Sequence, residues 1–157
     1  MISTVEKILF LKSVALFGNI PSEDLSHVAR ITEEIDVSPT QSIVSEGEAG
    51  DSMYLLINGE VKVHVGNHQI TTLGSQQFFG EMAILDSEPR SASVTALTQV
   101  TALRIQQNDF SEILSEKPEI AQGIIKVLTR RLRDANRESL SKASVAPDSA
   151  SNHKVAS

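Results

Sequence analysis

The sequence predicts a mainly β protein with flanking helices, in which an antiparallel β-roll or jelly roll carries N-terminal helices and a C-terminal helix pair. Three observations predict it. Short apolar runs repeat through the middle of the chain, turn dipeptides separate them, and helical periodicity is confined to the two ends. With 157 residues, 40% of them apolar and 22% charged, the chain has the size and composition of one globular domain.

Two helices are expected before the β region. Ser3 and Glu6, three residues apart, fit a capping box, and apolar residues then recur at roughly helical spacing, at Ile8, Leu9, Leu11 and Leu16. Ser22 is expected to cap a second helix that ends at Ile31, because two acidic residues follow it where the helix dipole favours negative charge.

Seven or eight short strands are expected from Ile35 onward. The apolar runs are bounded by Gly, Pro, Asn and Asp, and they cover residues 43–44, 53–57, 61–65, 70–73, 94–97 and 100–105. The dipeptides Asn58-Gly59 and Gly66-Asn67 tolerate the positive φ of tight hairpins. Strands of this length and spacing are typical of a sandwich or roll of antiparallel sheet.

Two helices are expected after the strands. Asn108 is a candidate cap for the first, and Pro118 suits the first turn of the second. The last helix carries one apolar stripe, formed by Ile120, Ile124, Val127, Leu128 and Leu132. Its basic residues (Lys126, Arg130, Arg133 and Arg137) are interpreted as a solvated face. Residues 141–157 are rich in Ser and Ala and are expected to be a disordered tail, which leaves residues 1–140 as the domain.

Composition excludes several classes of protein. Without cysteine, the chain has no disulfide, thiolate nucleophile or zinc–thiolate site, and its net charge of −6 disfavours general binding of polyanions. No apolar run approaches a membrane span, so a cytoplasmic protein without membrane contact is expected. His64 and His68 flank a hairpin without a third ligand, which makes a metal site a poor interpretation. No nucleophile motif is present, so no enzyme is expected.

One segment, residues 78–94, has features of an anion site. Gly80 allows close backbone approach, and residues 81–85 can form a helical turn whose free N–H groups attract an anion. Pro89 fixes the backbone before Arg90, whose forked guanidinium suits a phosphate, while Glu81 can only accept hydrogen bonds. A ligand with one phosphate charge and a nearby hydroxyl fits both residues. The alternative is a surface ion pair between Glu81 and Arg90.

The same segment resembles the phosphate-binding cassette of cyclic nucleotide-binding domains. The matching residues run Phe79-Gly80-Glu81-Met82-Ala83 and, after a spacer, Pro89-Arg90-Ser91-Ala92. Upstream, the glycine-punctuated hairpin of the family is matched by Gly47, Gly50, Asp51, Met53, Tyr54 and Gly59. The likeness runs from about residue 5 to residue 140. Two motifs in the right order make the resemblance specific.

The resemblance implies roles for individual residues. Arg90 would pair with the cyclic phosphate, Glu81 would accept the ribose 2′-OH, and Gly80 would let the sugar approach. Further hydrogen bonds would come from the backbone around Met82 and Ala83 and from the Ser91 hydroxyl. The remaining implied site residues are Ala92 in the cassette, Val63, Ile70 and Thr71 on the base side of the roll, and Arg131 and Asn136 facing the purine from the last helix.

The resemblance also implies a function. The chain is expected to be a stand-alone cyclic nucleotide sensor, for cAMP rather than cGMP because Ser91 stands where a Thr often accompanies cGMP preference. It would signal in trans to an effector protein as its C-terminal helices repack, with the stripe Ile124, Leu128, Leu132 read by that partner or by a second copy in a homodimer. No DNA binding is expected, since the sequence after Arg137 lacks an amphipathic helix pair. The alternative is a degenerate β-roll interaction module that binds no nucleotide.

Overall fold

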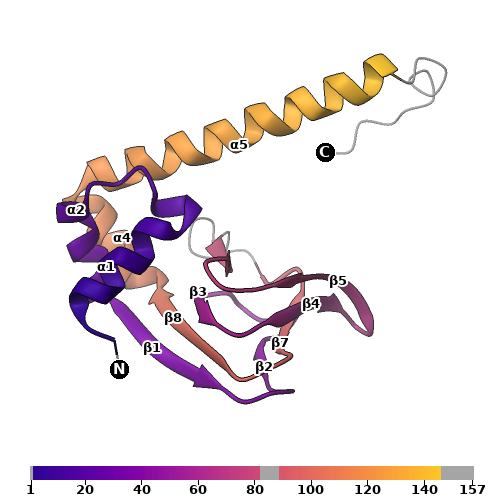
Figure 1. Ribbon diagram of the computed structural model, residues 1–157, viewed down its shortest axis with the longest axis horizontal. Helices are drawn as coiled ribbons and strands as arrows, with labels where there is room; N and C mark the ends of the chain where they lie inside the picture. Colours follow the sequence, from indigo (N-terminus) through magenta and orange to yellow (C-terminus); the bar gives the residue numbers. More distant parts are fainter. Residues whose placement is uncertain (1, 82–88, 146–157) are drawn as a thin grey trace.

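The computed structural model describes residues 2–81 and 89–145. Helix α1 (Thr4–Ser13), a 3-10 turn η1 (Ala15–Phe17) and helix α2 (Ser22–Arg30) come first, and helices α4 (Gln107–Glu116) and α5 (Pro118–Val145) come last. The strands of the described residues lie between them (Figure 1): β1 (Thr32–Val37), β2 (Ser42–Val44), β3 (Ser52–Asn58), β4 (Val61–Val65), β5 (His68–Leu73), β6 (Phe78–Phe79), β7 (Ser93–Ala96) and β8 (Val100–Gln106). The predicted fold class is confirmed.

The strands form two four-stranded antiparallel sheets, in the orders β1-β8-β3-β6 and β2-β7-β4-β5. The chain crosses between the sheets repeatedly, which rolls them around a common interior. Gly59 and Gly66 have the predicted positive φ, +92° and +57°, and the turn at Gly66 closes the hairpin of β4 and β5. The hairpin predicted at Gly59 is wrong, because β3 pairs with β6 and β8 while β4 pairs with β5 and β7, so this turn passes the chain from one sheet to the other.

Two hydrophobic clusters fill the molecule, and β3 contributes to both. Met53 and Leu55 pack with the helices, whereas Tyr54 and Leu56 point into the roll. A strand covered on both faces needs no alternation of polar and apolar residues, which explains why residues 53–57 form a continuous apolar run. The helices thus rest on the outer face of one sheet and leave the roll interior for the second cluster.

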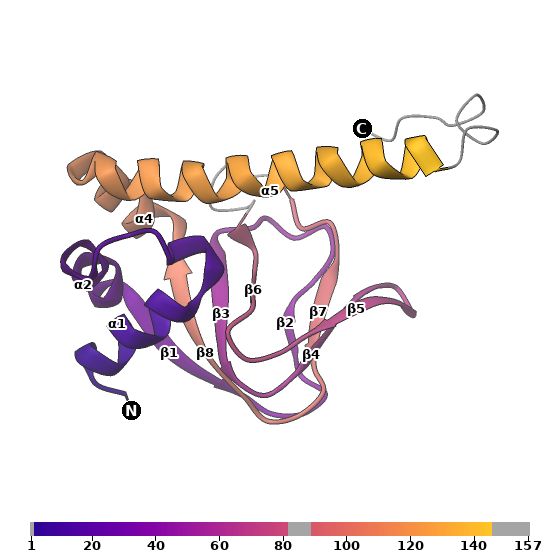
Figure 2. The ribbon, with the colours of Figure 1, turned by 45° about the horizontal axis from the view of Figure 1, so that its top comes forward.

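Helix α5 is packed at its start and exposed beyond it. Ile120, Ile124 and Val127 are buried, and a Cβ on Gly123 would lie 3.0 Å from Ile20, so the helix sits close to the turn after η1. Further along, Leu132 is 63% exposed, and Figure 2 shows the helix running over the roll and past it. Within the described residues, none of the helices has the length and apolar character needed to cross a membrane.

Several boundaries differ from the sequence predictions. Pro21, not Ser22, is the N-cap of α2, because its backbone already has the extended conformation of a cap. At α4 the N-cap is Gln106, and the backbone carbonyl of Asp51 accepts the first N–H of the helix at 2.8 Å, so Asn108 is not needed there.

The last helix and one strand also differ. Helix α5 continues to Val145, past the predicted end at residue 140, since no proline or glycine stands between residue 140 and Pro147. Residues 146–157 of the predicted tail lie outside the described residues. Strand β6 was not predicted, because two residues are too few to show a period.

The capping box of α1 is confirmed, and it supports a prediction. Ser3 Oγ accepts the Glu6 N–H, and Glu6 Oε1 accepts the Ser3 N–H, both at 3.2 Å. Ser3→Ala is expected to lower the free energy of unfolding, measured by urea denaturation, by about 1 kcal/mol. Ser22→Ala is the control and should have no such effect, because Ser22 is not a cap.

The same box has a pH dependence. The hydrogen bonds from Ser3 hold the pKa of Glu6 below its ordinary value. A lowered pKa means that the stabilisation is present above the unfolded-state pKa and is lost as the pH falls through the folded-state pKa. The carboxylate accepts from the backbone N–H of residue 3, which Ser3→Ala would keep, so Glu6→Gln is the variant that removes the titration. The difference in unfolding free energy between wild type and Glu6→Gln should therefore shrink in acid. A difference that stayed constant down to about pH 3 would show that the Glu6 carboxylate contributes nothing.

Candidate functional site

The backbone of Arg90 is anchored by the loop between β2 and β3. Its carbonyl accepts the Gly47 N–H at 2.8 Å, its own N–H donates to the Glu48 carbonyl at 2.9 Å, and an isolated bridge pairs Ala49 with Pro89. Two segments about forty residues apart in sequence are therefore joined at this point. The side chain of Arg90 therefore projects from a backbone that is held in place by hydrogen bonds, although the residue lies outside any strand.

The side chain of Arg90 is half-buried and lies against Gly80. Its Nη2 donates to the Ser52 carbonyl at 2.5 Å. A Cβ on Gly80, whose φ is +87°, would stand 2.6 Å from Arg90 Nη1 and 2.7 Å from that same carbonyl. The resemblance implied that Gly80 makes room for a sugar. In the structure, the space that a Cβ would take is already bordered by the arginine and by β3.

The position of Gly80 is set by the residue before it. Phe79 is buried, pairs with Tyr54 across β3 and β6, and stacks on the Tyr54 ring with centroids 5.1 Å apart. Phe79 thus fixes the point at which the chain leaves the sheet for the cassette. Glu81 follows directly, half-buried and helical.

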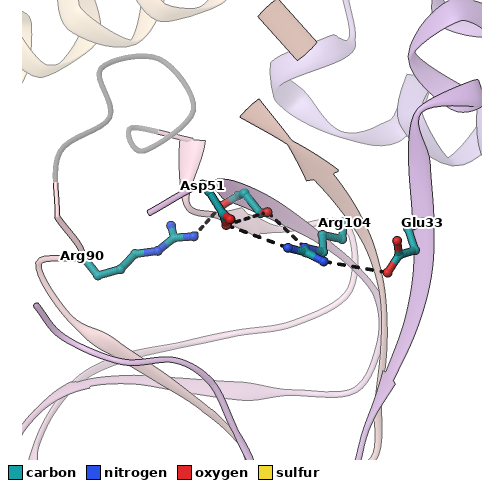
Figure 3. A network of polar contacts seen from close by, with 5 residues as sticks. Glu33, Asp51, Arg90 and Arg104 are labelled. Carbon is teal, nitrogen blue, oxygen red and sulfur yellow. Dashed lines mark hydrogen bonds and ion pairs between the residues drawn. The ribbon is translucent and has the colours of Figure 1, made fainter. Parts of the chain in front are cut away.

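A second arginine, which the sequence interpretation missed, lies close to Arg90 (Figure 3). Arg104 of β8 donates from Nε to Ser52 Oγ at 3.0 Å, and its two terminal nitrogens each lie 3.9 Å from a carboxylate oxygen, of Glu33 and of Asp51. Ser52 Oγ donates in turn to Asp51 at 3.0 Å. The sequence indicates this arginine in one way: it is a charged residue inside the apolar run 100–105, on the same face of the strand as Val100 and Ala102.

The other cassette residues are placed only in part. Ser91 is exposed and Ala92 half-buried, between Arg90 and β7. Met82 and Ala83 lie outside the described residues, as does the rest of the helical turn predicted for 81–85. The structure therefore brings Gly80 and Arg90 together at the two ends of the cassette, with Glu81 next to Gly80 in the chain.

The three residues expected on the base side lie in the β4–β5 hairpin. Val63 is half-buried against the cluster inside the roll and pairs with Thr71 across the hairpin and with Val94 of β7. Thr71 therefore shares the inner face with Val63. Ile70 is 55% exposed and falls where the register shifts. Because β7 begins shortly after Arg90, this face continues from the cassette.

The two residues expected on the last helix lie on different faces of it. Arg131 places its guanidinium carbon 5.1 Å from the centre of the Phe78 ring, beside the entry to the cassette. Asn136 is exposed and lies five positions further along the chain, which corresponds to about 140° around a helix of 3.6 residues per turn. That either residue faces the purine stays a prediction.

His64 of the β4–β5 hairpin has ordinary hydrogen-bond partners. His64 Nδ1 lies 2.8 Å from the Gly66 carbonyl, and its Nε2 lies 2.8 Å from Thr95 Oγ1. Across residues 2–81 and 89–145, no three or more His, Asp or Glu side chains are arranged to hold a metal ion.

Comparison with known proteins agrees with this geometry. The chain is 28% identical over 131 residues to the CRP-like cAMP-activated global transcriptional regulator of Mycobacterium tuberculosis, covering 80% of this chain and 58% of that protein. It is 37% identical over 119 residues to a cyclic nucleotide-gated potassium channel of Rhizobium etli, covering 76% of this chain and 33% of the channel. The chain thus spans only part of the length of both relatives.

A solved structure and a family model extend the comparison. The N-terminal domain of a transcriptional regulator from Streptomyces coelicolor superposes with a TM-score of 0.74 at 28% identity, covering 82% of this chain and 95% of that domain. The family model of the cyclic nucleotide-binding domain matches residues 34–117, more than half of the chain, and this range includes both ends of the cassette. The chain belongs to the cyclic nucleotide-binding domain family.

Proposed function

We propose that this protein is a regulatory sensor that binds a cyclic nucleotide at the cassette, with cAMP preferred over cGMP. The observation that carries the proposal is the half-buried guanidinium of Arg90, held against Gly80 by the backbone of β3 and of the β2–β3 loop. Two relatives are described as cAMP-activated and cyclic nucleotide-gated, which supports the ligand class.

The chemistry of the site suits such a ligand. Among the described residues, the contact with Ser52 uses one of the five N–H donors of Arg90, and a guanidinium can pair with a phosphate through two others. In this proposal Glu81 accepts the ribose 2′-OH, while Ser91 and the backbone of Met82 and Ala83 complete the anion site. The inner face of Val63 and Thr71 receives the base.

The proposed response passes to helix α5. Arg131 packs over Phe78, and Phe78 lies two residues before Gly80, so the cassette and the helix share a contact. A ligand that draws the cassette toward Arg90 would change that contact and repack α4 and α5. The shift between the two packings is limited by the difference in ligand affinity between them. An effector in a separate chain would then read α5.

The proposal is tested by calorimetric titration of the dialysed full chain with cAMP and cGMP, with 5′-AMP as control. We expect binding of both cyclic nucleotides, tighter for cAMP, and much weaker binding of 5′-AMP, whose phosphate carries more charge and lacks the ring. Absence of heat and of thermal stabilisation with both cyclic nucleotides would overturn the proposal and favour the interaction module.

The exposed face of α5 supports a homodimer. The stripe predicted for a partner is not available here, because Ile124 is buried and Leu128 is half-buried. A different set is exposed and spaced four, three and four residues apart, the spacing of a coiled-coil seam: Ile125, Thr129, Leu132 and Asn136. We propose that a second copy packs against this face.

Leu132→Asp is expected to turn the dimer into a monomer, because two carboxylates would meet in an apolar seam. Light scattering after size exclusion measures the mass. Val65→Asp, on the exposed β4–β5 hairpin, is the matched control and should leave the dimer intact. A monomeric wild-type protein at about 100 µM would contradict the homodimer, since stable dimers have submicromolar dissociation constants.

A further inference from the structure

We infer that Arg104 is a positioning residue for Arg90: by holding Ser52 and Asp51, it keeps the charge of Arg90 available to an anion. The inference deepens the proposed function and takes the anion to be the cyclic phosphate. It starts from a juxtaposition in Figure 3, in which Arg90 and Arg104 approach Asp51 from opposite sides.

Arg104 occupies an inward position of its sheet. It is the register partner of Tyr54 on β3 and of Glu33 on β1, and Tyr54 belongs to the cluster inside the roll. Its side chain is 28% exposed. A charge on this face needs partners, because removal from water without them is strongly unfavourable. Each part of the guanidinium has one: Ser52 at Nε, Glu33 at Nη1 and Asp51 at Nη2.

Ser52 joins the two arginines. It is fully buried, its Oγ accepts from Arg104 and donates to Asp51, and its carbonyl accepts from Arg90. Arg104 therefore fixes the residue whose carbonyl orients Arg90. The ion pairs of Arg104 at 3.9 Å would contribute little by themselves. The inference rests on the buried hydrogen bonds through Ser52.

Asp51 gives the arrangement an electrostatic consequence. Among the described residues, its carboxylate pairs with Arg104 and accepts from Ser52, and it makes no ion pair with Arg90. Without Arg104, the carboxylate would be left beside one remaining guanidinium, that of Arg90, and would turn toward it. A phosphate would then have to displace a carboxylate before it could bind. Arg104 thus prevents neutralisation of Arg90 from within the protein.

Arg104→Gln tests this inference in the full chain. We expect cAMP affinity to fall about tenfold, the scale of one charge-assisted hydrogen bond. Asp51→Asn added to Arg104→Gln should restore the part of the affinity that the Asp51 carboxylate removes, which loss of fold stability would not allow. Arg130→Gln, which removes the same charge from the exposed surface of α5, is the matched control and should stay within about twofold of wild type. Equal affinities of Arg104→Gln and Arg130→Gln would overturn the inference.

A second measurement needs no nucleotide. The ¹⁵N–¹H resonance of Arg90 Nε, assigned by its loss in Arg90→Lys, should move in Arg104→Gln and stay in place in Arg130→Gln. An unmoved resonance overturns the role of Arg104. A wild-type protein that binds no cyclic nucleotide overturns the proposed function, while a moved resonance would still support the action of Arg104 on Arg90. If circular dichroism shows Arg104→Gln to be unfolded, Arg104→Lys, which keeps the charge but lacks Nε, should show the same shift.

Discussion

Arg90→Ala is expected to weaken cAMP binding by about 2 to 5 kcal/mol, the range for truncating one partner of a buried hydrogen-bonded charge pair. In the proposed site, the half-buried guanidinium of Arg90 pairs with the phosphate. In Arg90→Ala the negative charge of the phosphate would enter the same site without a cation to balance it. In dissociation constants this is a loss of about thirtyfold to several thousandfold. Calorimetric titration of the variant measures it.

Two further variants separate charge from shape. Arg90→Lys keeps the charge but lacks the fork, so its affinity should lie between wild type and Arg90→Ala. Arg130→Ala removes an exposed arginine from α5 and should leave the affinity unchanged. If Arg90→Ala binds cAMP as tightly as wild type, the phosphate is held elsewhere and the site assignment is wrong.

The parts of the fold that the sequence predicted are those with local causes. The strand predicted for residues 61–65 coincides with β4, because apolar residues alternate there between the turn at Gly59 and the hairpin turn at Gly66. Gly59 and Gly66 were predicted from the dipeptides alone, and both have positive φ. Helix caps were harder, since Pro21 and Gln106 compete with better cap formers one or two residues away.

The parts that could not be predicted depend on register. In the sequence alone, Arg104 is a single charged residue in an apolar strand. Its partners Glu33 and Ser52, more than fifty residues away, lie beside it only because β8 is placed between β1 and β3. Likewise, the motif identified Gly80 and Arg90 but not their contact, which requires β3 to lie behind both. Such contacts follow from topology, which no local pattern contains.

The last helix shows the same limit in another form. The sequence predicted one apolar stripe along α5, and a period of 3.6 residues identifies a face but not what covers it. In the structure most of the stripe is covered, since Ile120, Ile124 and Val127 are buried and Leu128 is half-buried. Its last member, Leu132, is exposed, because the face of α5 that carries it is not covered by the described residues of the roll.

Gly80→Ala should disturb both stability and binding, and Gly47→Ala provides the comparison. The two glycines have nearly the same φ, +87° and +85°, so alanine suffers the same backbone strain of about 1 to 2 kcal/mol at each. Their surroundings differ: a Cβ on Gly47 meets nothing within 4 Å, while a Cβ on Gly80 would stand 2.7 Å from the Ser52 carbonyl.

The difference between these variants therefore measures the crowding at Gly80. Because β3 lies in the middle of its sheet, the Ser52 carbonyl cannot easily move, and overpacking there should add about 1 to 3 kcal/mol to the loss of unfolding free energy. Arg90 Nη1 would lie 2.6 Å from the same Cβ, so the guanidinium would be pushed away from the Ser52 carbonyl that orients it. The affinity for cAMP should therefore fall at least tenfold. Urea denaturation and calorimetry measure the two effects. Equal destabilisation of both variants would show that Gly80 is required only for its positive φ. It would also show that the position of the Arg90 side chain does not depend on the absence of a Cβ at residue 80.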